Sequence, residues 1–130
     1  MIESELNALS EKVIGCAYTV SNTLGSGFLE KVYENALAIE IRKLGLRVEC
    51  QKSVPVYYEG VIVGDYFADL VVEGILLIEL KVSKAFDDNH KAQCLNYLNA
   101  IKLPLCLLIN FGKPRVEVKR IFQSQYLQNA

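Results

Sequence analysis

The chain has 130 residues, of which 52% are hydrophobic, and its formal net charge is −1. This length suits a single domain over residues 1–130, with a core large enough to need no disulfide or metal for stability. The near-zero net charge does not by itself indicate a nucleic-acid partner. The hydrophobic fraction is slightly above that of an average globular domain, and a homodimer interface could account for the excess.

The first residues of the chain and its four cysteines indicate where in the cell the protein is expected. The segment MIESELNALSEKV is acidic and lacks the apolar run of a signal peptide. No stretch approaches the roughly 18 uninterrupted apolar residues of a membrane span. Cys16, Cys50, Cys94 and Cys106 are widely spaced in apolar surroundings, so buried free thiols are favoured over zinc ligands or disulfides. We therefore expect a cytoplasmic protein with no membrane partner.

The charges are unevenly distributed along the chain. Residues 1–80 carry 6 Lys and Arg against 12 Asp and Glu, whereas residues 81–130 carry 8 against 3. Such asymmetry can build a basic face beside an acidic one. On charge alone, a solvated surface with no partner is an equally good interpretation.

Two helices are predicted first. Apolar residues recur at spacings of three and four over residues 6–24, which predicts one helix that ends at Gly25 and Gly27. A second helix is predicted over residues 28–44, where Gly45 stops it. Three successive strands follow within residues 48–82.

Turn signals separate those strands, and the chain then continues with one more helix and two strands. Glu59-Gly60 and Glu73-Gly74 are hairpin signals. Asp87 or Asp88 can cap a third helix that runs to about residue 101. Residues 103–111 read as a buried strand and residues 116–122 as an alternating edge strand. The order ααβββαββ predicts an α/β protein with a central mixed sheet flanked by helices.

Three charged residues lie in strands that are otherwise apolar, namely Asp69, Glu79 and Lys81. Moving each ion out of water costs several kcal/mol unless partners compensate, whereas strand propensities differ by only about 1 kcal/mol. Because side chains alternate along a strand, Glu79 and Lys81 share a face and Leu80 takes the other. Strand propensity does not explain these charges, so we interpret them as a candidate site.

The turn between the second and third strands decides where Asp69 points. A two-residue turn at Glu73-Gly74 would place Asp69 on the face opposite Glu79. A three-residue turn over residues 72–74 would pair Asp69 with Leu77, diagonal to Glu79 on one face, with Gly74 in the left-handed region. We favour the second register, because grouping the charges offsets burial costs that each would otherwise carry alone.

Two carboxylates at such close range repel, so one is partly protonated or a cation lies between them. Oxygen ligands from Asp and Glu suit Mg²⁺ or Mn²⁺, with water and a substrate phosphate completing the coordination. The structural alternative is an ion pair of Lys81 with Asp69 or with Glu79 at the end of the sheet.

The helices add further candidates. Glu30 lies at the edge of the apolar arc predicted for the second helix, and Glu34 follows one turn later. A solvated glutamate is the stronger interpretation for Glu34 than for Glu30. On the third helix Gln93 and Tyr97 share a face, where they could orient a water, a phosphate or a carboxylate, or else cap backbone groups. His90 is interpreted as a solvated rather than a catalytic residue.

Collected in chain order, these motifs resemble the GxxExxY family, a branch of the PD-(D/E)XK nuclease-like superfamily. The name-giving motif matches residues 27–33 within GSGFLEKVYENAL, the metal-site pattern matches Asp69 and Glu79-Leu80-Lys81, and a Q-x-x-x-Y helix matches Gln93 and Tyr97. The resemblance runs from about Leu24 to Phe122, with Ala68 in place of the proline that precedes the motif aspartate.

The resemblance implies a restriction-endonuclease-like core and an Mg²⁺-dependent nuclease, with Mn²⁺ as a substitute and DNA favoured over RNA as the substrate. In that analogy the metal is held by Asp69, Glu79, the Leu80 carbonyl and Glu30, directly or through water. Lys81 positions the attacking water, Gln93 orients the site and Tyr97 supports it. The alternative is a catalytically inactive module that uses the same fold to bind nucleic acid or a protein partner.

Overall fold

A computed structural model describes residues 3–127. The elements follow the predicted order ααβββαββ: α1 Glu3–Leu24, α2 Glu30–Lys43, β1 Val48–Tyr58, β2 Val61–Val72, β3 Leu76–Lys81, α3 Asp88–Ile101, β4 Leu105–Asn110 and β5 Glu117–Phe122. A short 3-10 helix over Ser124–Tyr126 comes last. The predicted fold class is confirmed, and the helix and strand limits lie within a few residues of those expected.

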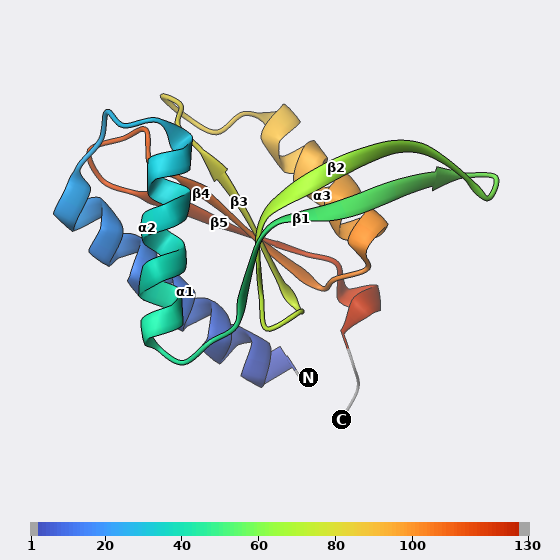
Figure 1. Ribbon diagram of the computed structural model, residues 1–130, viewed down its shortest axis with the longest axis horizontal. Helices are drawn as coiled ribbons and strands as arrows, with labels where there is room; N and C mark the ends of the chain where they lie inside the picture. The colour runs from blue at the N-terminus through green and yellow to red at the C-terminus, as the bar shows by residue number, and fades with distance from the viewer. Residues whose placement is uncertain (1–2, 128–130) are drawn as a thin grey trace.

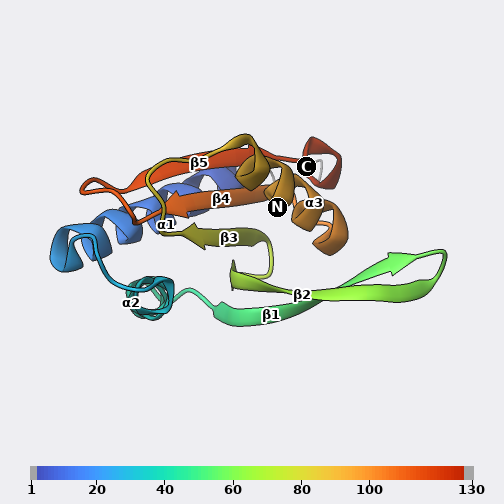
Figure 2. The ribbon, with the colours of Figure 1, turned by 90° about the horizontal axis from the view of Figure 1, so that it is seen from above.

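The five strands form one mixed sheet in the order β1-β2-β3-β4-β5. Only β3 and β4 are parallel, and the other neighbours are antiparallel. The helices α1 and α2 cover one face, whereas α3 covers the other (Figures 1 and 2). Because helices cover both faces of β3 and β4, these central strands are almost entirely buried, which accounts for their continuous apolar sequences.

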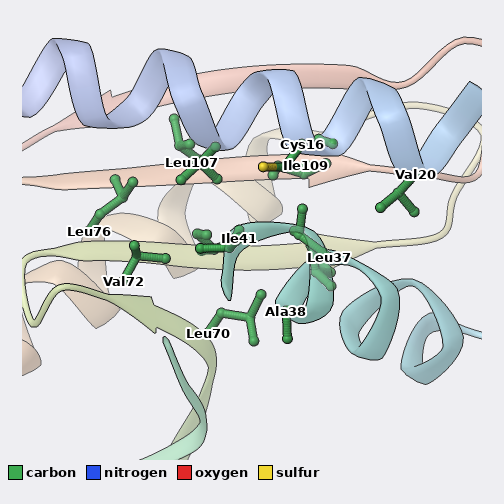
Figure 3. Packing of buried hydrophobic residues seen from close by; sticks show 14 of the residues in the cluster. Cys16, Val20, Leu37, Ala38, Ile41, Leu70, Val72, Leu76, Leu107 and Ile109 are labelled. Carbon is green, nitrogen blue, oxygen red and sulfur yellow. The ribbon is translucent and has the colours of Figure 1, made fainter. Parts of the chain in front are cut away.

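The larger of two hydrophobic clusters lies between the sheet and the helices α1 and α2. Figure 3 shows Cys16 and Val20 of α1 and Leu37 of α2 around strand residues such as Leu76 and Leu107. A smaller cluster joins the opposite face of the sheet to α3. None of the helices in residues 3–127 has both the length and the apolarity needed to cross a bilayer.

The outer half of the β1–β2 hairpin, residues 55–66, extends beyond the rest of the molecule and is called the arm below (Figures 1 and 2). Tyr58 pairs with Val61, which leaves Glu59 and Gly60 as the predicted two-residue turn. Both turn residues have positive φ, 49° and 78°, as a primed turn that matches the strand twist requires.

The prediction for the cysteines is confirmed for three of them. Cys16, Cys94 and Cys106 are buried free thiols, but Cys50 is free and exposed. The expectation of burial was wrong for Cys50 because it lies on the edge strand β1. There its sulfur accepts a 3.7 Å contact from the Arg42 guanidinium instead of packing in a core.

Candidate active site

The β2–β3 turn determines how Asp69 meets Glu79. The strands pair from Leu70 with Ile78 to Val72 with Leu76, so the turn consists of residues 73–75. Its predicted length of three and the positive φ of Gly74, 69°, are confirmed. The predicted turn residues 72–74 and the pairing of Asp69 with Leu77 were wrong, because the register continues to place Asp69 directly opposite Glu79.

Contacts with the start of β1 explain this shift in register. Glu73 also adopts positive φ, 54°, although it is not a glycine. Its backbone N–H donates to the Arg47 carbonyl at 2.9 Å, and its carboxylate accepts from the Arg47 backbone N–H at 2.7 Å. These bonds hold Glu73 inside the turn. Extended by one residue beyond Leu70 and Ile78, the register brings Asp69 opposite rather than diagonal to Glu79. The two acids are called the carboxylate pair below.

Asp69 is held by two hydrogen bonds. Its Oδ2 accepts from the backbone N–H of Leu80 at 2.8 Å, and its Oδ1 accepts from Nε2 of Gln51 at 3.3 Å. The Asp69 carboxylate thus bonds to the backbone of β3 two residues beyond Ile78, where the pairing of β2 with β3 ends. The Leu80 side chain points the other way and is buried in the α1–α2 cluster.

Glu79 is the most perturbed acid of the site. Its side chain is buried, with only 6% of the residue exposed, and its Oε1 has no hydrogen-bond partner among residues 3–127. Burial, followed by the neighbouring Asp69 carboxylate, raises the pKa of Glu79 to about 10. An unpartnered buried oxygen beside a second carboxylate fits a bound cation, which would favour the ionised form of both acids.

Lys81 lies half-buried at the end of β3. Within residues 3–127 its ammonium group forms no ion pair within 4.0 Å, so neither the pair with Asp69 nor the pair with Glu79 occurs. Its charge nevertheless lowers the pKa of both Glu79 and Glu30. Lys81 is therefore near the carboxylates without being neutralised by one of them.

Glu30 begins α2 and is exposed. Desolvation of its carboxyl, and then the Asp69 carboxylate, raise the pKa of Glu30, while Lys81 lowers it. Glu30 is consequently near enough to Asp69 and Lys81 for their charges to act on its carboxyl. Among residues 3–127, however, three or more His, Cys, Asp or Glu side chains do not gather closely enough to hold a metal ion.

Tyr33 fixes the turn from which Glu30 projects. Its hydroxyl donates to the Gly25 carbonyl at 2.7 Å and accepts from the Phe28 backbone N–H at 3.2 Å. The fully buried ring stacks on Phe111 with centroids 4.7 Å apart. The tyrosine of the GxxExxY motif is therefore a structural clamp on the loop before α2.

The two helical candidates on α3 differ in position. Tyr97 stacks on Tyr66 with centroids 3.7 Å apart, and burial followed by Glu79 raises the pKa of both tyrosines. Gln93 is exposed, and within the described part of the chain no hydrogen bond links it to Asp69 or Glu79. Tyr97 is thus close enough to Glu79 for that carboxylate to raise its pKa, whereas Gln93 forms no hydrogen bond with the carboxylate pair within residues 3–127.

His90 has a structural task at the start of α3. Its backbone N–H donates to Oδ1 of Asp87 at 3.0 Å, and its Nδ1 accepts from the Asp87 backbone N–H at 3.3 Å. This reciprocal pair is a capping box. The His90 side chain is half-buried and hydrogen-bonded to Asp87 rather than fully solvated as expected.

Sequence reasoning missed a polar network on the other side of Asp69. Glu34 is only 2% exposed, so the expectation of a solvated glutamate was wrong. Its carboxylate pairs with Lys31 and accepts from Nε2 of Gln51 at 2.6 Å. Gln51 in turn donates to Asp69 and adopts positive φ, 52°, within β1. A non-glycine residue in that region is uncommon and often marks a functional site.

The burial of Glu34 in this network also means that the face of α2 predicted to be buried was partly wrong. Its buried face consists of Tyr33, Glu34, Leu37, Ala38 and Ile41. The predicted apolar arc included Phe28, Leu29 and Val32, which are exposed. Gln51 was not a candidate because no local motif surrounds it. Tyr66 was also missed, and its hydroxyl is buried without a partner within residues 3–127.

The comparisons with known proteins agree with the fold. A family model described as the PD-(D/E)XK nuclease superfamily matches residues 7–121. The fold is similar to one solved protein, described as the crystal structure of SSO0001, with a TM-score of 0.53 and 20% sequence identity. The alignment covers 93% of this chain but 59% of that one, so this chain spans little more than half of its length. No curated protein matches the sequence.

Proposed function

Since the chain belongs to the PD-(D/E)XK nuclease superfamily, we propose that it is a metal-dependent nuclease that hydrolyses phosphodiester bonds in DNA. Membership of the superfamily indicates nuclease activity in general; the metal and the choice of DNA are parts of the proposal. The observation that carries it is the carboxylate pair, in which a buried Glu79 oxygen has no partner within residues 3–127 and Lys81 stays unpaired close by.

The residues suit a divalent cation. Asp69 and Glu79 would bind it together with the Leu80 carbonyl, and Glu30 would reach it directly or through water. Two protein carboxylates with waters and substrate oxygens are a usual ligand set for Mg²⁺, and Mn²⁺ accepts the same oxygen donors. When bound, such an ion makes water a better nucleophile and stabilises negative charge on phosphoryl oxygens.

The other residues would position the attacking water and the Asp69 carboxylate and stabilise the charge that develops during hydrolysis. The Lys81 ammonium is not neutralised by an ion pair within residues 3–127, so its protons are available to orient the attacking water and to stabilise the developing phosphorane charge. Gln51 keeps the Asp69 carboxylate in place through its 3.3 Å hydrogen bond, with the buried Glu34 as its second partner. Tyr97 supports the carboxylate pair by packing on Tyr66. Gln93 would reach the substrate from the exposed side of α3.

One observation favours the alternative of a module that binds nucleic acid or a protein partner without cleaving it. Within residues 3–127, no third His, Cys, Asp or Glu completes a metal-ligand cluster with the carboxylate pair. In a nuclease, the Leu80 carbonyl, waters and the substrate have to supply the remaining ligands. We also propose that the chain belongs to the GxxExxY branch of the superfamily, because Gly27, Glu30 and Tyr33 match its motif.

The test is incubation of the purified protein with single- and double-stranded DNA and with RNA of the same sequences, in Mg²⁺, in Mn²⁺ and in EDTA. We expect cleavage of DNA in Mg²⁺ or Mn²⁺ and none in EDTA. Binding without cleavage under all metal conditions would support the inactive module instead. Cleavage that continues in EDTA would contradict the role of the carboxylate pair as metal ligands.

A further inference from the structure

A groove of about 720 Å³ lies between the arm and the C-terminal half of α3. Its volume is within the range of about 300–1,000 Å³ that ligand sites occupy. Tyr57 of β1 lines it on one side, and Asn96, Tyr97, Asn99 and Lys102 line it on the other. Figure 1 shows how the hairpin extends past α3. No aspartate or glutamate is among the lining residues.

The groove lining combines apolar residues, namely Pro55, Val56 and Ala100, with polar ones, of which Lys102 and Asn99 offer free hydrogen-bond donors. Within residues 3–127, the Lys102 ammonium forms no ion pair within 4.0 Å. The Oδ1 of Asn99 already accepts from Nε2 of Gln123 at 3.0 Å and of Gln125 at 3.5 Å. The amide NH₂ of Asn99 is therefore the group left for a ligand, and it can only donate. A cation and free donors without an acid suit an anionic ligand rich in acceptors, such as a phosphodiester backbone.

Of the two tyrosines that line the groove, Tyr57 gives further information about the chemistry of the ligand. Tyr57 is 62% exposed although it sits on a strand, so its ring is available for stacking. Bases stack well on aromatic side chains only when they are unpaired, because the bases of a duplex already stack on one another. The combination of a stacking ring with phosphate donors is typical of sites for single-stranded nucleic acid.

Tyr97 links the groove to the candidate active site. Tyr97 lines the groove and also stacks on Tyr66, which lies beside Glu79. A strand lying in the groove would thus lead toward the carboxylate pair. The apolar residues at the tip of the arm, Val61, Ile62 and Val63, are exposed but do not line the groove. A second copy of the chain would be expected to cover that apolar tip rather than a groove that carries the unpaired Lys102 ammonium.

We propose that this groove binds a single strand of nucleic acid and presents it to the carboxylate pair. The inference rests on the proposed function, which it deepens by naming the form of the substrate. It assigns Tyr57 as the stacking residue and Lys102 and Asn99 as the phosphate-binding residues. These residues have no part in the hydrolysis itself.

The test measures binding without cleavage. The probe is a fluorescein-labelled oligothymidine of about 12 nucleotides, within the usual site size of single-strand grooves, and its affinity is followed by fluorescence anisotropy in EDTA. A duplex of the same length is measured in parallel. The groove variants are Tyr57→Ala and Lys102→Gln. Their matched controls are Tyr58→Ala, which is exposed but does not line the groove, and Lys12→Gln on α1, which covers the opposite face of the sheet.

We expect Tyr57→Ala to weaken oligothymidine binding by at least about fivefold, the lower end for one stacked base. Lys102→Gln should reduce the slope of log affinity against log salt by about 0.7, the value for one lost phosphate contact on a single strand. Both controls should bind as the wild type does. A merely structural role of Lys102 at the end of α3 would change the melting temperature but not the salt slope.

Several outcomes would overturn the groove assignment. They are wild-type affinity in both groove variants, binding of the duplex as tightly as of the single strand, or no binding of oligothymidine at all. Sedimentation that shows Tyr57→Ala converting a dimer to a monomer would assign the groove to a second copy instead. Binding through the groove with no cleavage in any metal would leave this inference standing while the proposed hydrolysis fails. Metal-dependent cleavage with an unchanged KM in the groove variants would instead support the proposed hydrolysis and overturn the groove assignment.

Discussion

The two faces of β3 differ in chemistry although their residues alternate along one strand. Toward α1 and α2, the side chains of Leu76, Ile78 and Leu80 are buried in a purely apolar part of the core. Toward α3, the strand ends in Glu79 and Lys81, of which Glu79 has a buried oxygen without a partner within residues 3–127. The apolar face stabilises the fold, whereas the charged face costs stability in the metal-free protein. Substitutions of neighbouring residues on β3 should therefore have opposite effects.

The largest effect is expected on the apolar face. Ile78→Ala removes a fully buried side chain and leaves a cavity, which should lower the free energy of unfolding by about 2–5 kcal/mol. Urea unfolding of the metal-free protein measures the change. Val32→Ala, which truncates an exposed side chain on α2, is the control and should change stability by less than about 0.5 kcal/mol. A loss for Ile78→Ala as small as the control's would mean that this face of β3 is not packed as described.

On the charged face, the effect of Lys81→Met distinguishes the proposed nuclease from a module that binds without cleaving. The substitution keeps much of the aliphatic stem and removes the charge, so cleavage should fall by at least about a hundredfold, the scale of one preorganised electrostatic group. DNA binding in Ca²⁺ should change far less. Lys12→Met on α1 is the control for loss of a surface charge. Metal-dependent cleavage that persists in homogeneous Lys81→Met protein would contradict the catalytic assignment.

Metal binding tests whether the carboxylate pair is the ligand set. Mn²⁺ or Mg²⁺ at 100 times its dissociation constant should stabilise the native state by about 2.7 kcal/mol and raise the melting temperature. Asp69→Asn and Glu79→Gln should each abolish that rise. Asp65→Asn, on the exposed part of β2, is the matched control and should keep it. A full response to metal in both pair variants would show that other residues bind the ion.

The smallest effect, for each pH unit, concerns the pH dependence of stability. The folded state raises the pKa of Glu79 from its ordinary value of 4.5 to about 10, so above pH 4.5 the folded protein holds a proton that the unfolded chain has lost. The unfolding free energy of the metal-free protein should therefore fall by up to about 1.4 kcal/mol for each pH unit as pH rises above 4.5, until Glu79 ionises near pH 10. Glu79→Gln should flatten this dependence and be more stable at high pH. Glu11→Gln, on an exposed part of α1, should not. An unchanged pH profile in Glu79→Gln would locate the titrating group elsewhere.

Local signals in the sequence determined the elements and most of their limits. Gly45 ends α2 with φ of 80°, Glu59-Gly60 forms the predicted turn, and Asp87 caps α3. Each of these features depends on residues only a few positions apart, so it can be read from the sequence. The presence of two acids and a lysine in apolar strands could also be recognised from the sequence, because charges in such strands are costly and therefore informative.

Only the tertiary structure decided how those residues meet. The register that places Asp69 opposite Glu79 depends on bonds between Glu73 and Arg47, 26 residues apart in the chain. The burial of Glu34 and the exposure of Glu30 depend on how α2 rotates against β1, where Gln51 supplies the donor. Local propensities do not encode such contacts, because their free energy arises only when distant segments have packed. The sequence by itself therefore determined the helices and strands and indicated the candidate residues Asp69, Glu79 and Lys81, while tertiary packing decided their register, their burial and the polar network that holds Asp69.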